Sequence, residues 1–119
     1  MSEHEKIDYI ELPARDLSAV KDFFKAAFGW QFEDFGEDYT AFTNQGVDGG
    51  FYQSDLSSSA ANGAALVIFY SDDLEATEKK ISAAGGEIVQ EVFSFPGGRR
   101  FHFADPCGNE YAVWTKTGV

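Results

Sequence analysis

Two glutamates and one histidine are the residues of this sequence whose types suit acid–base chemistry. Glu11 and Glu110 each lie in a stretch that predicts a β-strand, and His102 lies between two phenylalanines in a third. Partial burial would raise the pKa of either carboxyl and make it an acid, a base or an amine-binding group; a solvated strand end is the alternative. Arg100 and His102 share one predicted strand face, where they could bind an anion or transfer a proton. A hydrogen bond to a neighbouring loop is the alternative role for His102.

The elements that must position these residues occur twice in the chain. A shift of 57 residues (73 − 16 = 57) aligns residues 16–29 with residues 73–86 and gives six identities without a gap. Each copy begins with an alternating stretch, continues as a helix and closes into short strands. The pattern therefore predicts a tandem repeat of order βαβββ, in which the two halves join into one larger curved sheet with helices outside.

In the first copy, an alternating strand over 6–12 is expected to end at Pro13, because proline interrupts a sheet. A helix over 17–28 follows, with Asp16 as its N-cap and Gly29 as its stop. Turn residues separate three further strand candidates at Gln31–Phe35, Tyr39–Asn44 and Val47–Gln53.

The second copy is expected to begin after residues 54–63, whose small polar composition predicts a flexible linker. Asp72 and Glu75 are spaced as a capping box for a helix that runs to about Ala84 and is stopped by glycines. The predicted strands of this copy are Ala64–Tyr70, Glu87–Phe95, Arg99–Ala104 and Glu110–Thr115.

Composition restricts the class of protein. The chain has 119 residues, 44% of them hydrophobic, and a formal net charge of −11, which predicts one folded domain with its own core over 1–119. The excess negative charge disfavours nucleic acid and membrane surfaces as partners. The single cysteine cannot form an internal disulfide, which favours a reducing, cytoplasmic location.

Several segments together resemble the vicinal oxygen chelate superfamily, which includes glyoxalase I, bleomycin-resistance proteins and extradiol dioxygenases. They are the Asp-Leu pairs at 16–17 and 73–74, Phe-Gly-Trp at 28–30, Gly-Gly at 85–86 and Phe-Ala-Asp-Pro-Cys-Gly-Asn-Glu at 103–110. Within the superfamily, residues 29–34 and 93–103 look like a branch related to lactoylglutathione lyases. The resemblance implies an α+β fold of two βαβββ modules, about 5–53 and 64–116, around a U-shaped cavity. It also implies a homodimer, in which 54–63 could allow exchange of halves.

Catalytic members of the superfamily hold a divalent metal on the first and last strands of each half. The resemblance places these positions at Tyr9, Leu66, Ala112 and either Gly50 or Phe51. Only Tyr9 offers a ligand atom, so the sequence predicts that the usual metal centre and its glyoxalase I chemistry are missing. No cofactor is therefore expected; a divalent metal at a displaced site, on Glu11 or Glu110, is the alternative.

Alternation around those positions predicts an aromatic, partly acidic cavity. Its expected lining is Tyr9, Glu11, Phe51, Leu66, Ile68, His102, Glu110, Ala112 and Trp114. The leading interpretation is a metal-independent protein that binds a small organic molecule, with the acidity favouring cationic or neutral ligands. The alternatives are an enzyme of the lyase, isomerase or dioxygenase type that uses Glu11, Glu110 or His102, and a structural or regulatory subunit whose cavity is filled.

Overall fold

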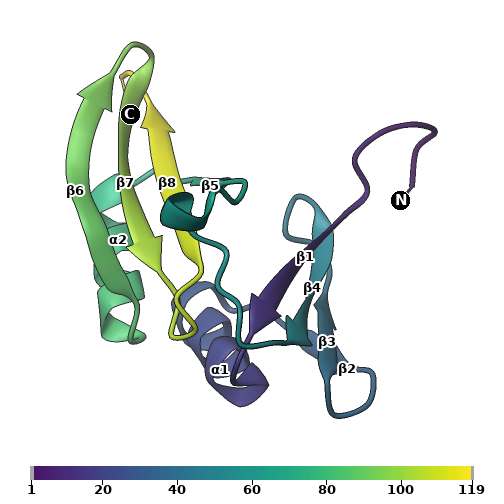
Figure 1. Cartoon of the computed structure of the whole chain (residues 1–119). Coiled ribbons are helices and arrows are strands. Elements are labelled where there is room, and N and C mark those ends of the chain that lie inside the picture. The colour runs from purple at the N-terminus through teal and green to yellow at the C-terminus, as the bar shows by residue number, and fades with distance from the viewer. Residues whose placement is uncertain (1, 119) are drawn as a thin grey trace.

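The computed structural model describes residues 2–118 and contains two four-stranded sheets and two α-helices (Figure 1). Module one comprises β1 (Tyr9–Ala14), α1 (Leu17–Phe28), β2 (Phe32–Asp34), β3 (Tyr39–Phe42) and β4 (Asp48–Gln53). Module two comprises β5 (Val67–Tyr70), α2 (Leu74–Ala83), β6 (Glu87–Phe95), β7 (Gly98–Ala104) and β8 (Glu110–Lys116). The predicted α+β repeat of two βαβββ modules is confirmed.

The two sheets have the same topology but are not hydrogen-bonded to each other. Their orders are β1-β4-β3-β2 and β5-β8-β7-β6, with the first pair of each parallel and the others antiparallel. The expectation of one continuous sheet was wrong. β1 and β5 each keep one edge unpaired within the described residues, and Figure 1 shows two separate sheets.

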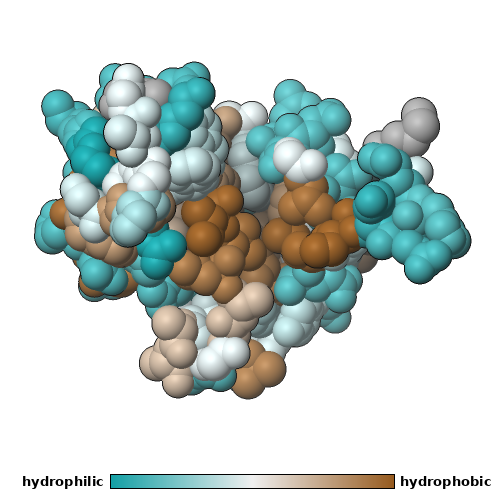
Figure 2. Space-filling view, turned by 90° about the horizontal axis from the view of Figure 1, so that it is seen from above, coloured by the Kyte–Doolittle hydropathy of each residue, from teal (hydrophilic) through white to brown (hydrophobic). Residues whose placement is uncertain are grey.

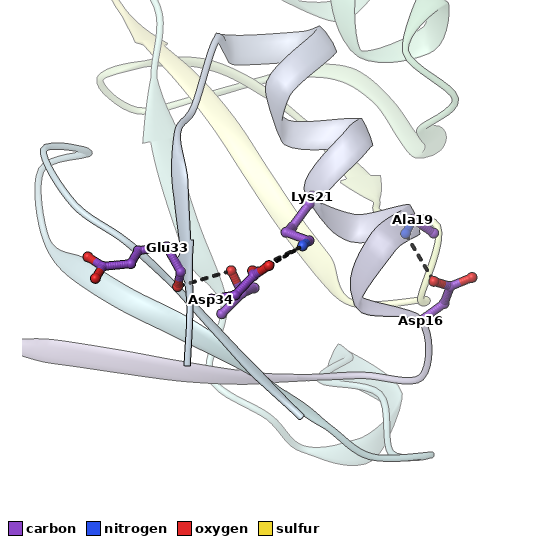
Figure 3. Close-up of polar contacts among 6 residues, drawn as sticks. Asp16, Ala19, Lys21, Glu33 and Asp34 are labelled. Carbon is purple, nitrogen blue, oxygen red and sulfur yellow. Dashed lines mark hydrogen bonds and ion pairs between the residues drawn. The ribbon is translucent and has the colours of Figure 1, made fainter. Parts of the chain in front are cut away.

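Helix α1 begins and ends where the sequence predicts. The Asp16 side chain accepts a hydrogen bond from the Ala19 amide at 3.1 Å, and Gly29 closes the helix with a φ of 72°. Figure 3 shows this cap together with Lys21, which reaches from α1 to the Asp34 carboxylate on β2 at 3.0 Å. The cap and the ion pair fix α1 over the sheet of its own module.

Two local predictions were wrong. Strand β1 does not stop at Pro13 but continues to Ala14, and Pro13 pairs with Tyr52 on β4. An edge strand tolerates proline because its outer side needs no amide donor. Helix α2 is capped by Asp73 rather than Asp72: the Asp73 side chain accepts from the Ala76 amide at 3.1 Å.

The core lies between the sheets and around α1. The Phe24 ring is fully buried and contacts residues of both modules, Phe51 on β4 and Phe69 on β5 among them. Its stacked partner Trp30 (ring centroids 4.4 Å apart) packs on Phe42 of β3. Helix α1 is therefore shared by both modules, so the module boundary is not a boundary between separate cores.

The segment 54–63 is anchored rather than loose. It contains a short 3-10 turn at Ala60–Asn62 and is hydrogen-bonded to the turn before β8 and to its first residue. The Ser58 amide donates to the Asn109 side chain at 2.8 Å, and the Ser57 hydroxyl donates to the Cys107 carbonyl at 3.0 Å. The small residues that predict flexibility instead let the backbone lie close against β8.

Neither helix of the described chain is long and apolar enough to cross a membrane.

Candidate functional site

The sheet face of module two that points away from the core carries a row of large side chains. Strand register places Phe93, Arg100, Trp114 and Tyr70 side by side across β6, β7, β8 and β5. The Tyr70 and Trp114 rings pack edge to face with centroids 5.1 Å apart. Arg100 therefore lies in the middle of an aromatic row, on the second strand of the sheet.

Strand β6 carries two register shifts against β7, one between Ile88 and Gln90 and one between Gln90 and Phe93. Their effects on alternation cancel, so Phe93 and Phe95 lie on the face of Arg100, whereas Ile88 and Val92 pack on the core. The guanidinium carbon of Arg100 lies 5.3 Å from the Phe93 ring centroid and 5.7 Å from that of Phe95, both within cation–π range.

These side chains border an open cavity of about 300 Å³ lined by Ile68, Phe95, Arg100 and Trp114. All four lining residues belong to module two. The cavity offers an aromatic wall, an aliphatic wall and one cation, a combination suited to a small organic molecule with a polar group.

The next row of the same face holds an imidazole–carboxylate pair. Register places His102 beside Ala112, and Ala112 beside Ile68. His102 Nδ1 lies 3.2 Å from Glu110 Oε2, and the amide of Ala60 donates to Glu110 Oε1 at 3.1 Å. Both hydrogen bonds lower the pKa of the Glu110 carboxyl, and the one from the Ala60 amide has the larger effect. In the tautomer that carries its proton on Nδ1, His102 donates a hydrogen bond to the Glu110 carboxylate and keeps its lone pair on Nε2.

Two buried nitrogen atoms on this face lack hydrogen-bond partners. Among the described residues, His102 Nε2 and Arg100 Nε are both buried without an acceptor or donor nearby. The His102 side chain is only 10% exposed. Since buried polar atoms are almost always hydrogen-bonded, two such atoms in adjacent rows mark a face whose hydrogen-bonding capacity is not filled by the protein.

The corresponding face of module one satisfies its own polar groups. The Tyr39 hydroxyl donates to Glu11 Oε2 at 3.0 Å and lies 2.6 Å from the Tyr9 hydroxyl. Burial, and then the hydrogen bonds with Tyr9 and Glu11, raise the pKa of Tyr39. The three side chains form a closed hydrogen-bonded chain across β1 and β3.

Gly50 makes room for that chain. A Cβ at Gly50 would overlap the Tyr39 hydroxyl and would lie 2.9 Å from the Thr40 carbonyl oxygen. Register pairs Glu11 with Gly50 and Ile68 with Ala112, and 68 − 11 = 57 reproduces the repeat offset. Of the two alternatives left open by the sequence, Gly50 is therefore the structural counterpart of Ala112.

The structure brings together some of the predicted site residues and separates others. Ile68, His102, Glu110, Ala112 and Trp114 share the outer face of module two. Tyr9 and Glu11 form the separate cluster on module one, so the two glutamates have different partners.

One predicted lining residue lies in the core instead, and the strand that follows Leu66 starts later than predicted. Phe51 is fully buried in the core against Phe24 and Phe42, because neighbouring strand residues alternate between faces. Leu66 precedes β5, which begins at Val67 rather than at residue 64.

Three side chains that complete the faces were absent from the predicted lining. Alternation along β7 did place Arg100 beside His102, and Trp114 was expected in the lining, but Phe95 and Tyr39 were not. Alternation from Ile88 and Val92, which pack on the core, places Phe95 on this face, so strand periodicity could have found it. Tyr39 reaches Glu11 by leaning over Gly50, and a side chain that crosses a glycine has no signal in strand periodicity.

The positions at which the superfamily holds a metal do not fit one here. Gly50 and Ala112 have no donor atom, Leu66 is apolar, and the Tyr9 hydroxyl is engaged by Tyr39. Nowhere in residues 2–118 do three or more His, Cys, Asp or Glu side chains come together in a group able to hold a metal ion. Zinc sites in proteins use three or four such ligands.

A second hollow lies between the modules. It has a volume of about 430 Å³ and is bounded by β1 and β5, with Trp30 and Phe42 among its walls. Figure 2 shows hydrophobic surface on both sides of this hollow, which is seen there from above. The hollow exposes part of the shared core along the two unpaired strand edges.

The repeated βαβββ topology and the outward-facing sites define a glyoxalase-type fold. The chain belongs to the Glyoxalase/Bleomycin resistance protein/Dioxygenase superfamily, whose sequence profile matches residues 6–113. Among solved structures, fosfomycin resistance protein FosX from Listeria monocytogenes is similar in fold, with a TM-score of 0.78 and 18% identity over 98% of this chain and 97% of that one. Lactoylglutathione lyase from Agrobacterium tumefaciens has a TM-score of 0.71 and 21% identity over 95% of each chain.

Two curated relatives are similar in sequence. Anthracycline biosynthesis protein DnrV from Streptomyces peucetius is 30% identical over 91% of this chain and 46% of its own length. The chain therefore spans about half the length of that relative. A glyoxylase-like domain-containing protein from Didymella fabae is 30% identical over 97% of both chains.

Proposed function

We propose that this protein binds a small organic molecule on the outer face of module two and does so without the metal centre typical of its superfamily. The observation that carries the proposal is the cavity lined by Ile68, Phe95, Arg100 and Trp114, together with the unfilled hydrogen-bonding capacity beside it. A fold neighbour named for fosfomycin resistance and a sequence relative named for anthracycline biosynthesis support a ligand of this kind. On module one, the Tyr39 hydroxyl is already hydrogen-bonded to Glu11 and Tyr9.

The test is a thermal-shift screen of aromatic compounds on the purified chain. A ligand at 100 times its Kd stabilises the folded protein by about 2.7 kcal/mol, a readily measured shift. The shift is expected to disappear in Trp114→Ala and to persist in Phe35→Ala, because Phe35 is 57% exposed on module one. Equal loss in both variants would place binding elsewhere or show a general effect on folding.

Metal analysis tests the metal-independent part. Protein purified without chelators is expected to contain less than stoichiometric zinc, nickel, manganese and iron, and its melting temperature is not expected to rise with any of them. Stoichiometric metal that is lost in Glu11→Gln or Glu110→Gln would overturn this part and favour a displaced site.

The His102–Glu110 pair favours a second candidate, an enzyme that moves a proton. Glu110 orients the imidazole through Nδ1, and the lone pair on Nε2 is then free to accept a proton from a carbon acid. The probe is exchange of the methylene protons of phenylpyruvate in D₂O, followed by proton NMR. Faster exchange than in His102→Gln supports the candidate, and equal rates exclude it for this probe.

The proposed assembly is a homodimer. Four large apolar side chains are exposed on or next to the two unpaired edge strands: Ile7, Tyr9, Ile68 and Tyr70, which are 87%, 42%, 46% and 44% exposed. Exposed apolar edges of this kind favour pairing with a second copy. Light scattering after size exclusion is expected to give twice the 13.1 kDa chain mass, and Ile68→Glu to shift the species toward monomer.

A further inference from the structure

The arginines of this acidic chain differ in their partners. Arg99 forms an ion pair with Glu75 at 2.6 Å, and Arg15 donates to the Ser57 hydroxyl at 3.0 Å. Arg100, next in sequence to Arg99, forms no ion pair or hydrogen bond with any side chain of residues 2–118. Its guanidinium is held only by aromatic rings.

The carboxylate of Glu110, on the same face of the sheet, forms no ion pair with Arg100. Both oxygens of the Glu110 carboxylate are already engaged, one by the Ala60 amide and the other by His102. The Phe93 and Phe95 rings attract the cation but accept no conventional hydrogen bond from Nε, which is buried and unpartnered. A guanidinium in this state lacks a planar acceptor.

We infer that the ligand of module two is a planar aromatic molecule with an anionic group, such as a carboxylate, which Arg100 binds while Trp114 and Phe95 contact the ring. This inference rests on the proposed binding function and specifies its ligand class. A carboxylate matches the forked donors of guanidinium and supplies the acceptor that Nε lacks. The rings beside Arg100 and a cavity of about 300 Å³ suit one or two fused aromatic rings.

The inferred ligand charge is opposite to that suggested by the net charge. The value of −11 describes the whole surface and predicts a preference for cationic or neutral ligands. Within the cavity, however, the one charged lining residue is Arg100. Contacts at a site decide ligand preference over the net charge of the chain, which is screened beyond roughly 10 Å in ordinary buffers.

The experiment compares three probes of equal shape and different charge: 2-naphthoate, neutral 2-naphthamide and cationic 2-naphthylmethylammonium. Binding to the full chain is measured by isothermal titration calorimetry. The wild type is expected to bind 2-naphthoate about tenfold or more tightly than 2-naphthamide. The reason is that the carboxylate forms a charge-assisted hydrogen bond with Arg100, which is stronger than the hydrogen bond of a neutral amide. Arg100→Leu is expected to remove this preference and to keep binding of the amide.

Arg99→Leu is the matched control, because Arg99 adjoins Arg100 but points to Glu75 on α2. It changes the net charge equally and should leave the preference for naphthoate intact. Equal affinities of naphthoate and naphthamide in the wild type, or an unchanged preference in Arg100→Leu, would overturn the inference while leaving the proposed binding function in place. If none of the three probes binds, and if Trp114→Ala also leaves the thermal shifts of the compound screen unchanged, both the inference and the proposed binding function are overturned.

Discussion

The two modules have one topology and different surface chemistry. On module one, Tyr39 crosses Gly50 and closes a hydrogen-bonded chain with Tyr9 and Glu11. On module two, Ala112 takes the place of Gly50, and the neighbouring His102 and Arg100 each keep one buried nitrogen without a partner. The difference shows that a repeated backbone does not repeat its side-chain contacts: Tyr39 is hydrogen-bonded to Tyr9 and Glu11 on one face, whereas two buried nitrogens on the other face have no partner.

The most damaging single change should be Phe24→Ala, because this ring joins the cores of both modules. The ring is fully buried and contacts Phe51 in one module and Phe69 in the other. We expect a loss of about 3–5 kcal/mol in the free energy of unfolding, as for other buried phenylalanines. Urea denaturation followed by circular dichroism measures it, and the wild type should unfold in one transition. Two separate transitions in the wild type would show that the modules do not share a core.

Asn109→Ala should be the next largest change, because Asn109 ties module two to module one and to the connecting segment. Its side-chain amide donates to the Pro13 carbonyl at 2.7 Å, and its oxygen accepts from the Ser58 amide at 2.8 Å. Leaving these buried groups unpaired should cost about 2–3 kcal/mol. The control is Asn62→Ala, whose exposed side chain bonds only the Ser57 carbonyl. Equal melting temperatures of the two variants would contradict the anchoring role.

Gly50→Ala tests the closed chain on module one. The added methyl group would collide with Tyr39 and break its contacts with Glu11 and Tyr9, which should destabilise the fold by about 1–3 kcal/mol. In a Tyr39→Ala background the same substitution should cost less, since the collision with the ring is gone. A double-mutant cycle by thermal denaturation measures the coupling, and additive effects would mean that Tyr39 does not depend on Gly50.

The smallest expected effect is the acid sensitivity of the Glu110 pair on module two. Hydrogen bonds from Ala60 and His102 lower the folded-state pKa of Glu110 below the usual 4.5. Its stabilising contribution is therefore present above the unfolded-state pKa and is lost as pH falls through the folded-state value. Glu110→Gln should lose less stability than the wild type between about pH 5 and pH 3 in denaturant titrations.

The pKa of Asp105 is shifted in the direction opposite to that of Glu110, so Asp105 serves as a comparison. Burial raises the pKa of the Asp105 carboxyl, although hydrogen bonds from Tyr111 and Asn109 oppose the shift. Its contribution is present below the unfolded-state pKa and declines as pH rises through the folded-state value. Asp105→Asn should therefore change the pH dependence in the direction opposite to Glu110→Gln, and parallel profiles would disprove this assignment.

Local signals predicted most of the elements. Apolar spacing and the Asp16 and Gly29 ends gave α1 its observed bounds, and the strand predicted over Glu87–Phe95 has the bounds of β6. Predictions failed where the outcome depended on a neighbouring strand. Pro13 continues a strand because β1 is an edge, and Phe51 is core because register assigns Gly50 to the outer face.

Parts of the candidate site were also predictable. Alternation placed His102 and Arg100 on one face, and Glu110 and Trp114 on the same face of β8. Phe95 was missed although alternation from Val92 would have placed it on this face; only the pairing of Gln90 depends on register shifts, which are a property of two strands together.

The sequence by itself determined the repeat, the helices and the apolar set that forms the core. These depend on residue type and on spacing along one segment. Only the tertiary structure decided that the sheets stay separate, that Tyr39 fills the outer face of module one, and that Arg100 remains without a partner. Those outcomes depend on distances between residues far apart in the chain, and periodicity within a segment carries no information about such distances.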